Sequence, residues 1–293
     1  MRIVLQTLGS PEGKSVWAVA KFLHRFLGSP QVLRMPAFWR FLLLDFFILP
    51  FYSWGAARRY RKVWCPRERC SLQMAKTRAL AQRLQEALPQ AQVLVESFTG
   101  TPVGDADLFI PLYPHYADSS FGLLAGTRKN VVPPYGDNPD FVNALAKLFE
   151  KHAGTIKAEQ VILSFHGVPA DSPDAERYRA ECLKTAEFFS VAAKIDPAKI
   201  RVGFQSKFGP KKWLSPSTKS LVRNAPVPAV LLPAGFVCDC IETVHELGEL
   251  TAGTSVKLLP CLNEDAAEIF KNMTIRLTDC QRKAFDNAVK SSV

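Results

Sequence analysis

Several short apolar runs in this sequence stop at glycine or proline and are followed by helical patterns. The clearest is residues 161–169, which read Val-Ile-Leu-Ser-Phe-His-Gly-Val-Pro. Its apolar, partly β-branched start predicts a short buried strand, which Gly167 and Pro169 end. In open α/β sheets, ligands bind at the carboxyl ends of the strands. His166 is therefore a candidate site residue, although a histidine here can also simply cap the strand.

The same rhythm of strand and helix recurs along the chain. Apolar runs typical of strands occur at residues 3–8, 93–95, 108–112, 161–165, 200–206, 229–232 and 256–259. Patterns typical of helices occur at residues 15–27, 71–88, 138–152, 174–193 and 266–293. Strands that alternate with helices are typical of parallel sheets covered by helices. The sequence therefore predicts an α/β fold with two such layers.

The composition limits the size and the environment of the protein. The 293 residues suffice for two domains of ordinary size, and 47% hydrophobic residues suffice for a substantial core. The net charge of +10 favours anionic partners, namely nucleic acid, an acidic membrane surface or a small carboxylate. Seven cysteines are an odd number over a long chain, and an apolar strand begins at Ile3. These features predict a reduced, cytoplasmic protein without a signal peptide.

Residues 35–54 have the most unusual composition in the chain, because they are rich in phenylalanine, leucine and tryptophan. Arg40, Asp45 and Pro50 interrupt the segment, so no uncharged part of it approaches the about 20 residues that span a bilayer. Four basic residues follow at 58, 59, 61 and 62. Aromatic residues beside basic ones fit a membrane-surface segment or the lid of an apolar pocket, and an ordinary buried helix fits equally well.

A second candidate site lies between the last two predicted strands. On an α-helix, Glu242, Glu246 and Glu249 would share one face. Such a row of carboxylates can accept cations or pass protons, whereas a solvated acidic face is the simpler interpretation of Glu246 and Glu249. Cys238 and Cys240 are spaced as C-x-C, which is not the spacing of a zinc ribbon or a redox pair.

Three stretches resemble the signature motifs of the ferrochelatases, which insert ferrous iron into a porphyrin to make haem. They are Ser-Phe-His-Gly-Val-Pro at 164–169, the segment 204–216 that begins Phe-Gln-Ser-Lys, and Asp-Cys-Ile-Glu-Thr at 239–243. Further matches occur at 8–11, 22–27, 60–64, 111–116, 135–141 and 260–263, so the resemblance covers nearly the whole chain. It implies two Rossmann-like domains with parallel sheets flanked by helices and a porphyrin cleft between them.

The resemblance also implies a division of the chain. The N-terminal domain would comprise residues 1–130 with a hydrophobic lip at 35–54, the C-terminal domain residues 131–275, and a final helix residues 276–293. The lip of this family covers the substrate and touches membrane, so the protein would be cytoplasmic with peripheral contact at the inner face of the membrane. It would act on a porphyrin as a monomer or homodimer, without nucleic acid.

Carried over residue by residue, the resemblance makes His166 the histidine beside the porphyrin centre and Glu242 its partner across the cleft. Both would be catalytic and would contact the metal, with Glu246 behind them as a further metal-binding carboxylate. A porphyrin loses two N–H protons when the metal enters, and an imidazole that is largely neutral at physiological pH can accept one. The implied substrate-binding residues are Arg59, Ser71, Tyr116, Gln205, Lys207 and Trp213, and Arg58 shares with Arg59 and Lys207 the charge that suits propionates.

The chain departs from the family pattern mainly in its N-terminal half. Phe98 replaces the usual arginine of an Arg-Tyr-Gly-x-Pro stretch, and the helix that should follow is missing before the strand at 108–112. Two further readings therefore stay open: a chelatase for another metal or tetrapyrrole, and a non-catalytic haem or porphyrin binder. No iron–sulfur cluster is expected, because residues 116–120 lack the internal cysteine of some members and the tail has only Cys280.

Overall fold

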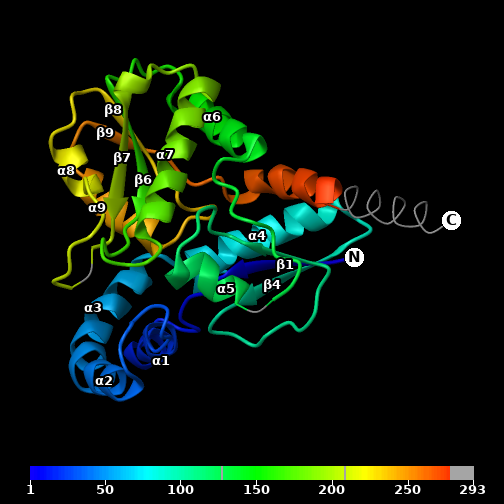
Figure 1. Ribbon diagram of the computed structural model, residues 1–293, viewed down its shortest axis with the longest axis vertical. Coiled ribbons are helices and arrows are strands. Elements are labelled where there is room, and N and C mark those ends of the chain that lie inside the picture. Colours follow the sequence, from blue (N-terminus) through cyan, green and yellow to red (C-terminus); the bar gives the residue numbers. More distant parts are fainter. Residues whose placement is uncertain (127, 208, 278–293) are drawn as a thin grey trace.

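The computed structural model describes residues 1–126, 128–207 and 209–277 and contains two parallel β-sheets (Figure 1). The N-terminal sheet has the order β4-β1-β5, and the C-terminal sheet has the order β7-β6-β8-β9. The strands are β1 (Arg2–Thr7), β4 (Gln92–Ser97), β5 (Leu108–Pro111), β6 (Gln160–His166), β7 (Ile200–Gln205), β8 (Ala229–Leu232) and β9 (Val256–Leu258), with a short antiparallel pair, β2 (Trp64–Cys65) and β3 (Cys70–Ser71). The predicted α/β fold with parallel sheets flanked by helices is confirmed.

Helices connect the strands. The α-helices are α1 (Val16–Leu27), α2 (Ala37–Leu42), α3 (Leu49–Lys62), α4 (Leu72–Ala87), α5 (Leu123–Ala125), α6 (Pro139–Ala153), α7 (Ala175–Ala192), α8 (Thr218–Arg223) and α9 (Leu247–Thr251). The π-helices are η1 (Leu43–Ile48), η2 (Asp118–Gly122) and η4 (Ile241–Glu246), and the 3₁₀-helices are η3 (Pro197–Lys199) and η5 (Asn263–Ala266). Residues 267–277 are also helical, whereas most of the C-terminal helix predicted at 276–293 lies outside the described residues.

Side chains of the C-terminal sheet are buried on both of its faces. In β6, Leu163 and Phe165 pack with residues of α6 and α7, whereas Ile162 packs on the opposite face with residues of α8 and α9. A parallel strand that is covered on both faces has a continuous apolar sequence rather than an alternating one. This burial explains why the strand at 161–165 is so clear in the sequence.

In each sheet the chain changes direction beside a central strand. The chain passes from β1 to β4 on one side and then to β5 on the other, and from β6 to β7 and then to β8 in the same manner. The carboxyl ends of the strands at such a point are where α/β proteins bind their ligands. Thr7 and Tyr113 lie at this point of the N-terminal sheet, and His166 lies at that of the C-terminal sheet.

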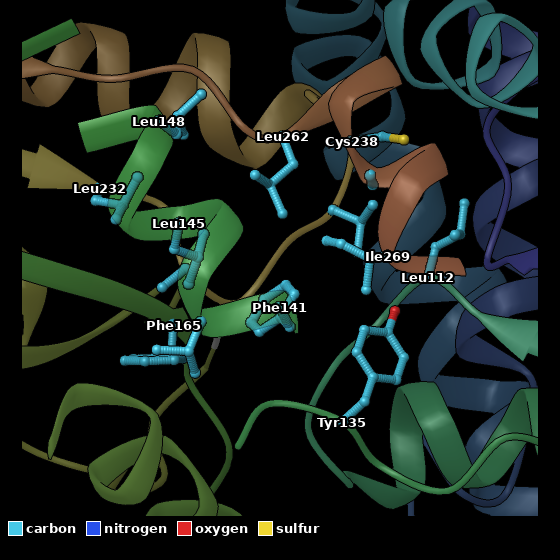
Figure 2. Packing of buried hydrophobic residues seen from close by; sticks show 14 of the residues in the cluster. Leu112, Tyr135, Phe141, Leu145, Leu148, Phe165, Leu232, Cys238, Leu262 and Ile269 are labelled. Atoms are coloured by element: carbon cyan, nitrogen blue, oxygen red, sulfur yellow. The ribbon is translucent and has the colours of Figure 1, made fainter. Parts of the chain in front are cut away.

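One apolar cluster joins the two sheets (Figure 2). Leu5 and Ile110 of the N-terminal sheet belong to the same cluster as Leu163 and Leu232 of the C-terminal sheet. Figure 2 shows Phe141 of helix α6 among side chains from both halves. Because protein interiors are packed as densely as organic crystals, this shared core fixes the two halves against each other.

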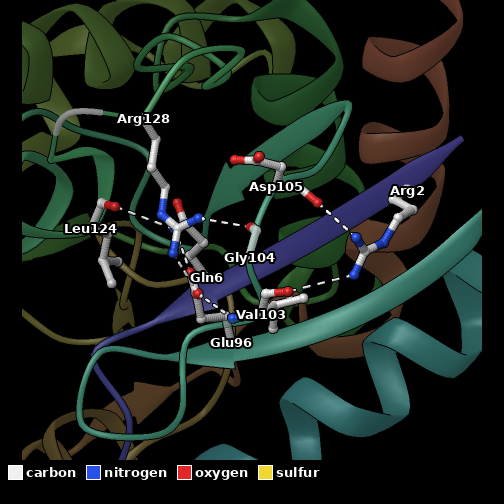
Figure 3. Close-up of polar contacts among 8 residues, drawn as sticks. All are labelled: Arg2, Gln6, Glu96, Val103, Gly104, Asp105, Leu124 and Arg128. Carbon is white, nitrogen blue, oxygen red and sulfur yellow. Dashed lines mark hydrogen bonds and ion pairs between the residues drawn. The ribbon is translucent and has the colours of Figure 1, made fainter.

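A polar network replaces the helix that is missing between β4 and β5 (Figure 3). The residues between these strands, 98–107, contain no helix, as the sequence predicts. They cross the face of the sheet on which Gln6 and Glu96 lie side by side, with Gln6 Nε2 donating to Glu96 Oε2 at 2.8 Å. Arg128 pairs with Glu96 at 2.5 Å, and Arg2 donates to the carbonyl of Asp105 at 2.8 Å. In the loop, the N–H of Val103 donates to Glu96 Oε1 at 2.9 Å and the carbonyl of Gly104 accepts from Arg128 at 3.2 Å, so the network holds the loop against a buried face.

Helices α2, η1 and α3 form one continuous helix, Ala37–Lys62, which projects with α1 at one end of the molecule (Figure 1). Ala57 and Tyr60 near its C-terminal end pack on Val19 of α1. The aromatic residues before them are exposed: Phe38, Trp39, Phe41, Phe46, Phe47, Phe51, Tyr52 and Trp54.

This exposure excludes the buried-helix interpretation of residues 35–54. By length and composition, the 26-residue helix is also long and apolar enough to cross a membrane, and only 11% of its most apolar window is buried. This length includes the charged residues Arg40 and Asp45, whereas the sequence estimate concerned only the uncharged parts of the segment.

Candidate active site

His166 is the last residue of β6, and its half-buried side chain is held in one orientation. Its Nδ1 lies 2.7 Å from the carbonyl oxygen of Gly167. A carbonyl only accepts hydrogen bonds, so Nδ1 carries a proton, and in the uncharged tautomer that fits this bond Nε2 holds the lone pair. Tyr178 fixes the backbone by donating to the His166 carbonyl at 2.8 Å, and the ring of Phe236 lies edge-on to the imidazole. The arrangement leaves Nε2 as the basic atom of the site.

Glu242 lies in the π-helix η4, whose N-cap is Cys240. Thr243 Oγ1 accepts the N–H of Cys240 at 2.9 Å and so caps the first turn. Burial raises the pKa of the Tyr60 hydroxyl and of the Cys240 thiol well above their ordinary values, and the negative charge of Glu242 raises both further. The pKa of Tyr113 is raised by burial too, with Glu242 contributing. Three groups that burial keeps protonated, from both halves of the protein, therefore lie near Glu242.

The other two glutamates of the motif have separate partners. Glu246 accepts hydrogen bonds from the N–H of Ser206 at 2.9 Å and from its hydroxyl at 2.6 Å. Glu249 pairs with Lys62 of α3 at 2.8 Å and with His245 at 3.2 Å. The predicted common face rests on α-helical spacing, and the π-helix alters that spacing because its bonds run from i to i+5.

The predicted metal residues do not form a closed ligand set. Within the described parts of the chain, no three His, Cys, Asp or Glu side chains are arranged to hold a metal ion together. His166 and Glu242 reach the site from different elements, β6 and η4, while Glu246 is bonded to Ser206.

A buried clamp that the sequence did not reveal supports η4. Asp239 accepts hydrogen bonds from Asn263 Nδ2 at 2.8 Å and from the N–H of Cys261 at 3.0 Å. The N–H of Asp239 donates to Asn263 Oδ1 at 2.9 Å. Both residues lie in motifs that carry the family resemblance, but nothing in the sequence indicates that they bond to each other. The clamp fixes the loop before Glu242 to the segment that leads into η5.

Two of the predicted substrate-binding residues lie next to His166. Trp213 packs against Gly167, where an added Cβ would come within 3.0 Å of the indole ring. Gln205 pairs in register with His166 and donates from Nε2 to the carbonyl of Glu242 at 3.2 Å. The structure therefore gathers these residues with Glu242 at the end of the C-terminal sheet.

The remaining predicted substrate residues lie on other elements. Ser71 is buried as the N-cap of α4 and hydrogen-bonds to Ser10, and the ring of Tyr116 lies under the guanidinium of Arg177. Arg59 stacks over the ring of Tyr52 on α3. Arg58 and Lys207 are exposed. No contact of these residues with His166 or Glu242 is seen among the described residues.

His115 is buried, unlike His166, and its environment keeps it neutral. The Thr185 hydroxyl donates to the carbonyl of Gly136 at 2.9 Å, so its oxygen accepts from His115 Nε2 at 2.8 Å. His115 Nδ1 is buried without a hydrogen-bond partner among the described residues. Burial lowers the pKa of His115 to about 3, and Asp137 opposes this shift only weakly. This histidine joins the end of β5 to α7 rather than serving as a base.

Comparison with known proteins agrees with this arrangement. The family model described as Ferrochelatase matches residues 2–273. The ferrochelatase of Brucella anthropi is 29% identical over 317 residues, covering 94% of this chain and 91% of that protein, and the ferrochelatase of Brucella ovis is 29% identical over 303 residues, covering 89% and 86%.

Among solved structures, CbiX, described as the terminal enzyme for biosynthesis of sirohaem in denitrifying bacteria, superposes with a TM-score of 0.51 at 16% identity. The superposition covers 92% of this chain and 96% of that one, which shows a shared fold. The family model covers almost all of the described chain, with the signature motifs at 164–169 and 204–216 at the ends of β6 and β7 and the motif at 239–243 leading into η4. This chain belongs to the ferrochelatase family.

Proposed function

We propose that this protein inserts ferrous iron into a porphyrin, protoporphyrin IX or coproporphyrin III, to form haem. Membership of the family supports a chelatase that inserts a metal into a tetrapyrrole. The observation that carries the proposal is that Gln205 lies opposite His166 in the sheet register and also bonds to the main chain of Glu242, so an oriented imidazole and a carboxylate come from neighbouring segments at the carboxyl end of the C-terminal sheet. A base and an anion are the two groups that this reaction requires.

The reaction exchanges one dication for two protons. As Fe²⁺ bonds to the four pyrrole nitrogens, the two N–H bonds break and both protons leave the macrocycle. Nε2 of His166 accepts one proton, since Nδ1 is already committed to the Gly167 carbonyl. The carboxylate of Glu242 balances the charge of the incoming dication and takes the second proton. The neutral Tyr60 and Cys240 beside it contribute no competing negative charge.

An absorbance assay of metal insertion into a porphyrin tests this function. Purified protein is mixed anaerobically with Fe²⁺ and protoporphyrin or coproporphyrin, and in parallel with Co²⁺. The free-base spectrum should convert to that of the metalloporphyrin. His166→Ala and Glu242→Ala should each abolish the conversion while the fold stays intact, because each removes a reacting group. Glu159→Gln, which changes a surface carboxylate paired with Lys199, is the matched control and should retain full activity.

Phe98 and the missing helix favour one alternative, a protein that binds haem or porphyrin without catalysis. A spectral shift on porphyrin addition without turnover would select this alternative. Activity of His166→Ala within a few-fold of the unmodified protein would instead reject the proposed role of the imidazole.

As part of the same proposal, residues 35–54 bind the inner face of a membrane peripherally from the cytoplasm. The exposed aromatic residues of Ala37–Lys62 and the basic residues in the last turn of α3 support it, because such a pairing suits anionic lipid headgroups. Replacing Phe46 and Phe47 by serine should reduce co-flotation with vesicles that contain phosphatidylglycerol. Phe188→Ser, at an exposed position of α7, is the control. Unchanged flotation of the double variant would contradict membrane contact.

A further inference from the structure

Gln205 contacts the chain on both sides of the candidate active site. It is the last residue of β7 and lies opposite His166 in the parallel register. Its main-chain carbonyl accepts the N–H of Gly167 at 2.8 Å, immediately after the histidine. Gly167 fits tightly here, since an added Cβ would lie 2.7 Å from this carbonyl oxygen. The backbone of Gln205 therefore fixes where the chain leaves β6.

The side chain of Gln205 contacts the segment that carries Glu242. Its Nε2 donates to the main-chain carbonyl of Glu242 at 3.2 Å, and its Oε1 accepts from the hydroxyl of Ser164 at 2.5 Å. The same Glu242 carbonyl accepts the N–H of Leu247, which is the i to i+5 bond of the π-helix. Gln205 thus supplies a second donor to the carbonyl at which η4 departs from α-helical geometry.

We infer that Gln205 is a positioning residue that sets the spacing between His166 and Glu242. The inference rests on the proposed function for its catalytic consequence. Only 5% of the residue is exposed, and both polar atoms of its amide are bonded within the protein. Gln205 is therefore better placed to hold Glu242 than to bind substrate, the role that the family resemblance implies. A small displacement of a reacting group can slow a reaction by about a hundred-fold.

Gln205→Met tests the inference, because methionine has similar length and no hydrogen-bonding amide. The kcat for metal insertion should fall about ten-fold or more, while the KM for porphyrin changes less than about two-fold. Gln85→Met is the matched control: Gln85 makes the same kind of amide-to-carbonyl bond, to Ala91 at 2.7 Å, away from the site. Its kcat and KM should not change.

Gln205→Glu adds a readout that a purely structural role would not move. The protonated carboxyl can donate to the Glu242 carbonyl, whereas the ionised form cannot, and burial raises the pKa of a carboxyl group. The kcat of this variant relative to the unmodified protein should therefore rise between pH 8 and pH 6. A flat ratio, or a KM increase of ten-fold with unchanged kcat in Gln205→Met, would overturn the inference and favour substrate binding.

Hydrogen exchange separates this inference from the proposed function. Exchange of the Leu247 N–H in the absence of substrate should accelerate about ten-fold in Gln205→Met and stay unchanged in Gln85→Met, because the π-turn loses a supporting bond. Failure of the unmodified protein to insert any metal would reject the function but leave this readout intact. Unchanged protection of Leu247 would reject the positioning role, whatever the activity.

Discussion

Lowering the pH should destabilise this protein through His115. The ordinary pKa of a histidine is about 6.5, whereas burial lowers that of His115 to about 3. Between these values the unfolded chain binds a proton that the folded protein does not, so the free energy of unfolding falls as the pH falls. At pH 5 the loss is about 2 kcal/mol, from roughly 1.4 kcal/mol for each pH unit below 6.5.

The packing around the ring supports this magnitude. His115 Nδ1 has no partner among the described residues that could accept a second N–H, and the ring is enclosed by Phe165 and Tyr178. On the remaining side Gly136 lies so close that an added Cβ would be 2.3 Å from Nε2. A protonated ring would therefore be both unsolvated and unpaired, apart from the distant attraction of Asp137.

Urea unfolding at pH 7.5 and pH 5.0 measures this effect. His115→Gln keeps a donor for Thr185 but cannot titrate. The variant therefore measures how much the free energy of unfolding changes with pH because of all the other titratable groups. The unmodified protein should lose about 2 kcal/mol more than the variant between the two pH values. Equal losses, or an NMR titration of His115 in the folded protein near pH 6.5, would refute the reasoning.

Two further substitutions probe the fold. Gly9→Ala should destabilise the protein by about 3 kcal/mol in urea unfolding, because φ is +86° and the added Cβ would lie 2.0 Å from Ser97 Oγ. Gly55 has open space around it, so the control Gly55→Ala should instead raise the free energy of unfolding by about 0.5–1 kcal/mol. Similar effects of the two substitutions would contradict the backbone geometry. Asn263→Ala should lower the free energy of unfolding by about 2 kcal/mol and accelerate hydrogen exchange at the Asp239 N–H, because the buried carboxylate of Asp239 loses a donor. The control is Asn224→Ala, at an exposed position. An effect of Asn263→Ala no larger than that of the control would argue against the clamp.

The sheets and the position of His166 could be predicted because both depend on local sequence. Parallel strands buried on both faces are continuous apolar runs, and the glycine or proline that ends each run marks the edge where ligands bind. The loop at 98–107 was predictable for the same reason, since too few residues separate its strands for a helix. Its anchoring by Glu96 and Arg128 was not, because that contact joins residues far apart in the chain.

Contacts between distant elements also explain what the sequence missed at the site. Glu242 and Glu249 share a face only if the turn between them is α-helical. The composition of the segment does not distinguish a π-helical turn from an α-helical one. The structure turns Glu249 to Lys62 instead. Gln205 was recognised as a site residue from its motif. Its bond to Glu242 joins residues 37 positions apart, so only the folded structure reveals it. The exposed aromatic face of α2 and α3 likewise depends on which side α1 covers.

The single apolar cluster that runs through both sheets has a consequence for how the protein comes apart. Each half loses a large part of its interior when the other is removed, since Leu5 and Leu163 belong to one packed group. Heating should therefore melt the two halves together, with equal calorimetric and van't Hoff enthalpies. Separately expressed halves should be aggregation-prone and should regain solubility only when they are refolded together. Large opening motions between the sheets are costly for the same reason, because they would break this packed group.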